Sequence, residues 1–332
     1  MVPWILNQLT DDLADVHIEY VSETLSTAYL DWGTLDAQLR SSIIRVVQSP
    51  RLKTLSLSWI KNMPFSVFVS LSSDLTTVQL EGVEVKIQSD SEGLESTNSD
   101  DTPRRVDLAQ TKRRLPRIKN LYDFYHDTDG MLASRPFVFD FEQLKLLHIC
   151  WGNEVQCALG KELMKAASKL ERLACIVDSP HKSAAGLAKA MLDYGLDASV
   201  TALTIGIAHQ TALPTIPDPD EYDLFLGLIE ELELLAGKNT VKSLRVHFDT
   251  TKDTHDRLTG SLGQLNDVIT HEAFPHLERF DLEFGVDWSE PFTLYTAPGA
   301  EDAWAECIYA QCRGLAAIPG LTFGFKIIIL GD

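Results

Sequence analysis

The chain of 332 residues lacks any apolar run long enough to cross a membrane, and it is poor in positive charge. A membrane helix needs about 20 consecutive apolar residues, so we expect no membrane partner. Lys and Arg number 29 against 48 Asp and Glu, which gives a formal net charge of −19. A surface of this charge repels phosphate at long range. We therefore expect no nucleic-acid partner.

Cysteine is also scarce, with five residues and no C-x-x-C pair. An odd number without paired spacing is typical of thiols that stay reduced inside the cell. The start of the chain, MVPWILNQLTDD, has neither the basic beginning nor the long apolar core of a signal peptide. The basic segment KRRLPR at 112–117 leaves nuclear import open. We expect a cytoplasmic or nuclear protein.

Signatures of catalysis are missing as well. The chain contains no G-x-G-x-x-G, no P-loop and no G-x-S-x-G. His271 and Glu272 begin a segment that resembles a zinc-binding H-E-x-x-H, but His276 comes one residue too late. Pro275 should also end a helix before His276. We expect no catalytic residue, no metal and no cofactor.

One short pattern does recur, in which an apolar residue is followed by a second three positions later and by a third two positions after that. Such an L-x-x-L-x-L pattern is the core of a leucine-rich repeat, where one short strand per repeat stacks into a parallel sheet. The nine copies are Leu13-Val16-Ile18, Leu52-Leu55-Leu57, Leu75-Val78-Leu80, Leu144-Leu147-Ile149, Leu170-Leu173-Cys175, Val200-Leu203-Ile205, Val241-Leu244-Val246, Leu277-Phe280-Leu282 and Ile318-Leu321-Phe323.

The distances between copies predict a helix after most strands. Seven of the eight steps fall between 23 and 41 residues, and most exceed the 20–29 residues of a regular repeat. Apolar residues at helical spacing predict helices over 34–48, 154–170, 183–194, 220–236, 258–269 and 300–315. The fold class that follows is α/β, a leucine-rich-repeat solenoid with a parallel sheet on its concave face and helices on its convex face. We expect a single domain over 1–332.

The remaining step is 69 residues long and separates the copies that begin at Leu75 and Leu144. Within it, residues 88–102 are Ser, Asp, Glu, Gly, Asn and Thr with few apolar residues, and a basic stretch follows. A segment of this composition buries too little apolar surface to fold by itself. We therefore predict a disordered insertion over 88–117, with order resuming near Leu121.

Residues that lie between the apolar positions of a strand should point away from the helices. On the later strands they carry polar groups of both charge signs, and a mixed polar surface suits protein recognition. We predict that a protein partner contacts His148, Arg245, His247, Asp281 and Glu283.

Three segments resemble the leucine-rich-repeat portion of fungal F-box-like proteins. They are SPRLKTLSL at 49–57, DLTTVQLEGV at 74–83 and FPHLERFDL at 274–282. In that family the repeats bind a substrate protein, and a separate F-box docks to a ubiquitin-ligase scaffold. The first copy of the motif begins at Leu13, so we expect the repeats without an F-box.

The sequence thus favours a non-enzymatic protein-interaction module, with substrate recognition related to F-box adaptors as its implied role. We expect a monomer by itself and a protein partner that the sequence does not identify. The alternative is an enzyme whose site is built from loops and has no readable motif.

Overall fold

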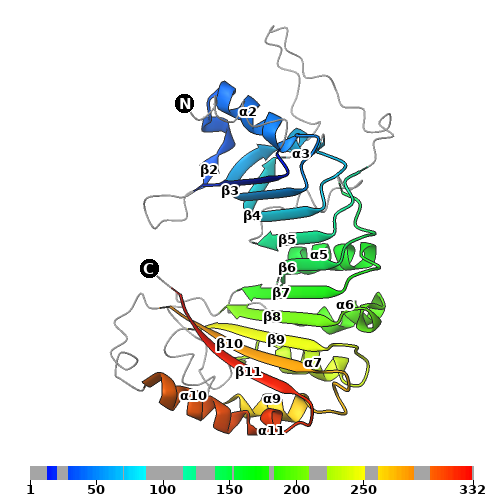
Figure 1. The fold of residues 1–332 in the computed structure, drawn as a ribbon, viewed down its shortest axis with the longest axis vertical. Coiled ribbons are helices and arrows are strands. Elements are labelled where there is room, and N and C mark those ends of the chain that lie inside the picture. Colours follow the sequence, from blue (N-terminus) through cyan, green and yellow to red (C-terminus); the bar gives the residue numbers. More distant parts are fainter. Residues whose placement is uncertain are drawn as a thin grey trace. The chain divides into compact units, whose positions relative to one another are not determined.

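The structure is a computed structural model that describes residues 13–20, 29–69, 71–86, 115–124, 139–151, 153–178, 183–208, 223–250, 261–287 and 300–330. Its contacts divide the chain into two compact units. Unit 1 comprises residues 1–119 and 125–141, and unit 2 comprises residues 120–124 and 142–332. In Figure 1, unit 1 runs from blue to cyan and unit 2 from green to red. No helix within the described ranges is long and apolar enough to span a membrane.

Unit 1 contains a short parallel sheet in the order β1-β3-β4, with β2 also paired to β3. Asp36 caps α2 by accepting a hydrogen bond from the Leu39 backbone N–H, which satisfies a group that the first turn leaves open. The elements are β1 (Asp15–Glu19), β2 (Leu30–Asp31), η1 (Trp32–Thr34), α2 (Ala37–Val47), β3 (Thr54–Pro64), α3 (Ser66–Val69) and β4 (Thr77–Lys86).

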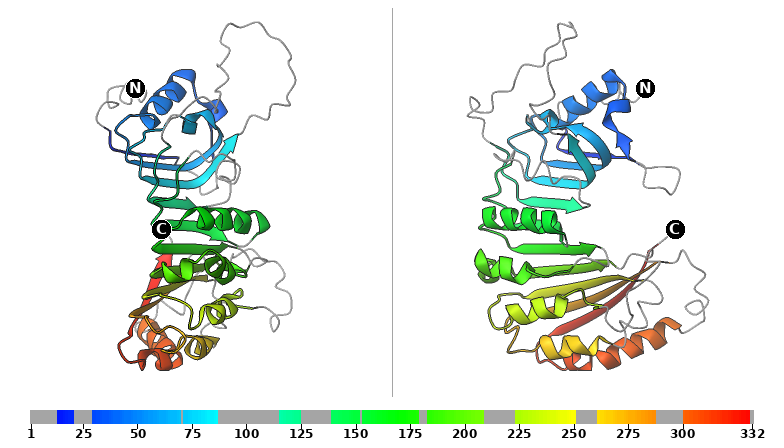
Figure 2. Two further views of the ribbon diagram at one scale, coloured as in Figure 1. Left: turned by 90° about the vertical axis from the view of Figure 1, so that its right-hand side faces the viewer. Right: turned by 180° about the vertical axis from the view of Figure 1, so that it is seen from behind.

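Unit 2 contains seven parallel strands in chain order, β5 to β11. Its helices lie on one face of this sheet (Figure 2). The elements are β5 (Asn120–Phe124), β6 (Leu146–Trp151), α5 (Glu154–Ala166), β7 (Arg172–Asp178), α6 (Leu187–Asp193), η2 (Leu196–Ala198), β8 (Ala202–Ala208), α7 (Leu228–Leu235), β9 (Ser243–Thr250), α9 (Gly263–Val268), β10 (Arg279–Asp287), α10 (Ala300–Gln311), α11 (Arg313–Ala316) and β11 (Thr322–Leu330).

The repeated apolar motif sets the register of the strands. Leu173 lies opposite Leu203, which in turn lies opposite Leu244, so the middle residue of one copy faces the middle residue of the next. These three leucines are at most 1% exposed. Because side chains alternate between the two faces of a strand, aligned motifs place one apolar row beneath the helices. The α/β class and its parallel strands are thereby confirmed.

Helix α5 illustrates how closely the helices pack against this row. Asn153 and Gln156 cap its first turn reciprocally. Gly160 lies over the sheet, where a β-carbon would come within 2.7 Å of Trp151 and 2.9 Å of Ile149. The absent side chain is therefore what allows α5 to approach β6.

Two of the observed helices begin later than the apolar periodicity predicts. Over 220–236, α7 begins only at Leu228, and over 183–194, α6 begins only at Leu187. Gly227 and Gly186 precede them in left-handed conformations, with φ of 78° and 86°. The helical spacing of apolar residues continues into buried turns, as at Leu224 and Phe225, so periodicity alone overestimates the helix.

Two strand predictions need correction. The 69-residue step contains a further strand, β5; Ile118 just before it and Leu121 within it occupy the first two apolar positions of the motif and are 0% exposed. In the last copy, Phe323 pairs with Phe280 and Phe325 with Leu282. Phe323 is therefore the middle residue of that copy, two positions later than Ile318-Leu321-Phe323 implies.

Most of the predicted disordered insertion, 88–114, lies outside the described residues. Its last three residues, 115–117, are described. The Asp140 backbone N–H donates to the Pro116 carbonyl at 2.9 Å, and Arg117 forms a parallel bridge with Asp140. Ordered backbone contacts are therefore present at Pro116 and Arg117, a few residues before Leu121, where order was predicted to resume. The single domain over 1–332 stays a prediction.

Candidate functional site

Six ionisable side chains gather on β9 and β10 of unit 2, on the sheet face that carries no helices, which we call the open face. This charged cluster consists of Arg245, His247, Asp249, Arg279, Asp281 and Glu283. The register places Arg245 beside Asp281 and His247 beside Glu283. Since the residues of each strand are two positions apart, strand alternation puts all six on one face.

Within the cluster, basic and acidic groups alternate. The Arg279 Nε donates to Asp281 Oδ2 at 2.7 Å, and Arg245 Nη2 lies 3.7 Å from the same oxygen. The Arg245 Nε lies 3.5 Å from Glu283 Oε1. Because Asp281 and Glu283 each face an arginine, these ion pairs hold the side chains of the cluster in place.

The alternation continues through the histidine of the cluster. His247 Nδ1 lies 3.7 Å from Glu283 Oε2, and its Nε2 lies 2.7 Å from Asp249 Oδ1. The order across the face is therefore Arg279, Asp281, Arg245, Glu283, His247 and Asp249. The imidazole ring is held between two carboxylates.

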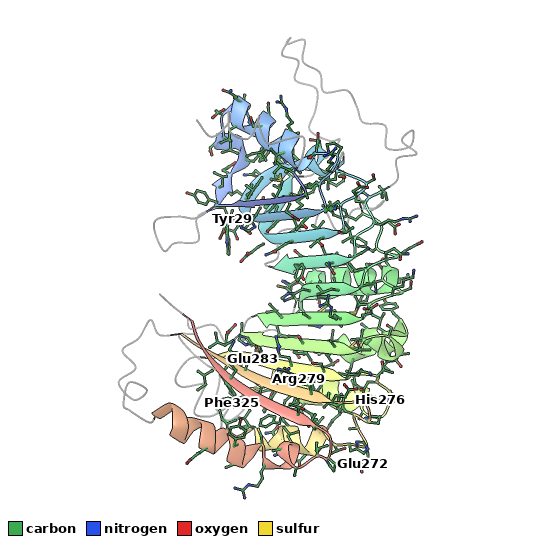
Figure 3. The ribbon with its side chains drawn as sticks, in the orientation of Figure 1. Tyr29, Glu272, His276, Arg279, Glu283 and Phe325 are labelled. Carbon is green, nitrogen blue, oxygen red and sulfur yellow. The ribbon has the colours of Figure 1, made fainter. Side chains whose placement is uncertain are left out.

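Two of the three carboxylates, Asp281 and Glu283, lie deep, whereas Asp249, at 39% exposed, and the arginines lie outside. The side chains of Asp281 and Glu283 are 9% and 16% exposed, whereas those of Arg245 and Arg279 are 45% and 59% exposed. The hydrogen bond and charge of Asp281 raise the pKa of Arg279 above its ordinary value. The cluster therefore presents two guanidinium groups to solvent. Figure 3 labels Arg279 and Glu283 of β10.

A glycine makes room for the central carboxylate. Gly324 on β11 lies opposite Asp281, and a β-carbon there would come within 2.5 Å of Asp281 Oδ1. The Asp281 side chain therefore extends over β11, which explains how a carboxyl-bearing residue on an open face can be only 6% exposed as a whole residue. Its ion pair with Arg279 offsets the cost of removing this carboxylate from water.

His148 stands apart from the charged cluster. It lies on β6, three strands from β9, which corresponds to about 14 Å at the usual strand spacing. Its ring makes an edge contact with Tyr122, at 6.3 Å between centroids. Burial lowers the pKa of His148 to about 4. His148 is therefore neutral at pH 7 and adds no charge to the open face.

Between His148 and the cluster, small or uncharged side chains occupy the open face on β8 and in the middle of β7, whereas the exposed Arg172 lies at the start of β7. Ala174 and Ile176 hold these positions on β7, and Thr204, Gly206 and Ala208 hold them on β8. These five residues form a mainly apolar strip beside the charged cluster. Apolar surface next to a polar rim is the usual composition of a protein interface.

The structure brings together four of the five predicted contact residues, namely Arg245, His247, Asp281 and Glu283. Sequence reasoning missed Arg279 and Asp249. Both could have been found by extending the two-residue alternation one further step along β10 and β9. On β11 the residue opposite Asp281 is Gly324, whereas the motif Ile318-Leu321-Phe323 would have placed Thr322 there.

In the part of the chain that the structure describes, no three His, Cys, Asp or Glu side chains are arranged to hold a metal ion. Glu272 and His276 of the H-E-like segment are exposed (Figure 3). The cysteines at 150, 157, 175, 307 and 312, all within the described residues, form no disulfide with one another.

A second polar group occupies β1 and β3 of unit 1. The His17 Nδ1 lies 2.7 Å from Ser56 Oγ, and its Nε2 lies 3.1 Å from Glu19 Oε2. Ser56 is 5% exposed, whereas the His17 side chain is 56% exposed. The three residue types are those of a hydrolytic relay, and sequence reasoning had not grouped them.

Comparison with known proteins adds no relative: neither a family model nor a curated protein sequence matches this chain.

Proposed function

We propose that this chain is a leucine-rich-repeat solenoid protein that recognises another protein through its open face and catalyses no reaction itself. The charged cluster is the observation that carries the proposal. It combines two exposed guanidinium groups with two carboxylates, Asp281 and Glu283, that are largely buried. Arginine that is already held in place loses little freedom when it binds, which is why it dominates many protein interfaces.

The adjacent strip on β7 and β8 gives this surface its apolar part. A partner that covers Ala174, Ile176 and Ala208 can place an acidic group against Arg245 or Arg279. The strip and the charged cluster keep a fixed spacing because they lie on consecutive, hydrogen-bonded parallel strands. The chain's charge of −19 disfavours an acidic partner at long range, so we expect the partner to present one acidic group locally, on a surface that is otherwise neutral or basic.

Substrate recognition in the manner of F-box adaptors is the specific role that we propose, on the strength of the segments at 49–57, 74–83 and 274–282. Affinity capture from cells with the tagged chain tests it. We expect a defined protein that wild type and Lys165→Glu retain and that Arg245→Glu loses. Lys165 is an exposed residue of α5 on the helical side, so it serves as a matched charge-reversal control. Capture of the same partner in equal amount by wild type, Lys165→Glu and Arg245→Glu would contradict the proposal.

The second candidate is hydrolysis at Ser56, His17 and Glu19, and their two short contacts favour it. We place it second because Ser56 is almost fully buried, whereas a nucleophile must reach its substrate. A fluorophosphonate probe separates the candidates. Labelling of wild type but not of Ser56→Ala would establish the enzyme, and we expect no labelling of either.

A further inference from the structure

The last strand of unit 2 ends the sheet without the features that protect sheet edges. Among the described residues, β11 pairs as a strand with β10 alone. Its sequence, TFGFKIIIL, has one charged residue, Lys326, and no proline. Natural edge strands are usually protected by several charges, proline or a bulge. An apolar edge of nine residues is therefore a strong template for another strand.

The side of β11 that faces the helices is also incompletely covered. Phe323 and Phe325 are partly exposed, whereas their equivalents on β10, Phe280 and Leu282, are 0% exposed. Tyr309 of α10 contacts both phenylalanines, with ring centroids at 5.7 and 6.2 Å, and is itself 46% exposed. Stacked-repeat proteins need a polar end to remain soluble as monomers, and this end is apolar.

The pairing of β11 with β10 determines which residues of β11 direct their backbone N–H and C=O groups toward the unpaired edge of the sheet. The Thr322 N–H donates to the Glu278 carbonyl, so Thr322 turns its backbone groups toward β10. Alternate residues point to opposite sides of a strand. Phe323 and Ile327 consequently turn their N–H and C=O groups toward the outer edge.

Charge distinguishes two antiparallel registers for a second copy of the same strand, one centred on Lys326 and one centred on Phe325. A twofold axis at Lys326 would place two lysines opposite each other, and like charges in that position destabilise a sheet. An axis at Phe325 instead places Lys326 of each copy opposite Gly324 of the other. Asp281 already extends over Gly324, so in this register each Lys326 reaches the Asp281 carboxylate of the other copy.

We propose that the chain forms a twofold dimer by antiparallel pairing of β11 with β11, in which Phe323 lies opposite Ile327 and Lys326 bonds Asp281 across the interface. This twofold arrangement is closed and self-complementary. On the side of the sheet that faces the helices, it brings the partly exposed Phe323 and Phe325 of one copy beside those of the other. The sequence alone gave the expectation of a monomer. The dimer does not depend on the proposed partner, because Arg245 and the strip on β7 and β8 remain accessible.

Sedimentation velocity across the micromolar range gives the first test. We expect a species of twice 37.0 kDa. Lys326→Glu, which places a carboxylate against Asp281, should weaken the dimer at least tenfold, whereas Lys326→Arg should preserve it. Thermal melting shows that each variant is folded. A monomer at all concentrations, or equal dimerisation of the two variants, would overturn the proposal.

Cysteine cross-linking tests the register. In a Cys307→Ser background, which removes the exposed thiol, Phe323→Cys and Ile327→Cys should cross-link when mixed, because their Cα atoms would lie about 5.5 Å apart. Neither variant should cross-link alone, because identical positions would be separated by about 13 Å along the strands. Cross-linking of either single variant as fast as the mixture rejects this register.

Discussion

At the scale of single residues, the missing side chain of Gly324 is what allows the central carboxylate of the cluster to be buried. Asp281 fills the space above Gly324 and from there orders both arginines. The proposed binding surface is thus shaped by a residue that has no side chain.

Gly324→Ala tests this packing. Alanine normally stabilises a strand relative to glycine, but here its β-carbon would lie 2.5 Å from Asp281 Oδ1. Displacing the carboxylate breaks its 2.7 Å hydrogen bond to Arg279, so we expect a loss of about 1–3 kcal/mol in the free energy of unfolding. Urea titration measures it. In an Asp281→Ala background the same change should be neutral or stabilising, and an undiminished loss there would refute the explanation.

His148 should make stability depend on pH. Its pKa is about 4 in the folded chain against an ordinary 6.5, so the unfolded chain binds the proton first as the pH falls. The free energy of unfolding should therefore fall between pH 6.5 and about pH 4, by up to about 3 kcal/mol. Above pH 6.5 the group is neutral in both states and contributes no pH dependence. His148→Gln should remove this component in urea titrations at several pH values, and identical slopes for the two proteins would contradict the assignment.

At the scale of elements, the L-x-x-L-x-L pattern predicts a strand well where all three positions are apolar. It missed β5 because Asp123 occupies the third position, although that residue is only 6% exposed. In the last copy, Ile318, Leu321 and Phe323 satisfy the pattern two residues too early, since Phe323 and Phe325 form an equally good pair. Register is set by pairing with β10, and a single sequence does not contain that information.

The approach of α5 to β6 gives a test at this scale. Gly160→Ala would normally stabilise a helix by about 1 kcal/mol. Its β-carbon would instead overlap Trp151 and Ile149, and we expect a net loss of about 1–3 kcal/mol. Gly263→Ala at the start of α9 is the matched control, because its nearest neighbour, Gln311, would be at an ordinary 3.5 Å. If chemical denaturation shows that Gly160→Ala lowers the free energy of unfolding less than Gly263→Ala does, the close packing of Gly160 is not required for stability.

At the scale of the whole molecule, the repeated motif predicts the class of fold because it describes the buried face of most of the strands. The open face is predicted less fully. Alternation identified four members of the cluster, but their contacts depend on neighbouring strands that are 36 residues apart in sequence, as Arg245 and Asp281 are. The depth of Asp281 depends on Gly324, which carries no recognisable signal. The low pKa of His148 likewise follows from burial that sequence alone does not report.

The central claim is that the charged cluster on β9 and β10 binds a protein partner. The most direct test is the dissociation constant of the captured partner, measured by calorimetry with wild type, Arg245→Glu and Lys165→Glu. We predict that Arg245→Glu weakens binding by about 1–3 kcal/mol and that Lys165→Glu leaves it unchanged. A partner that binds Arg245→Glu as tightly as wild type, but no longer binds Lys165→Glu, would place the interface on the helical side and contradict the account.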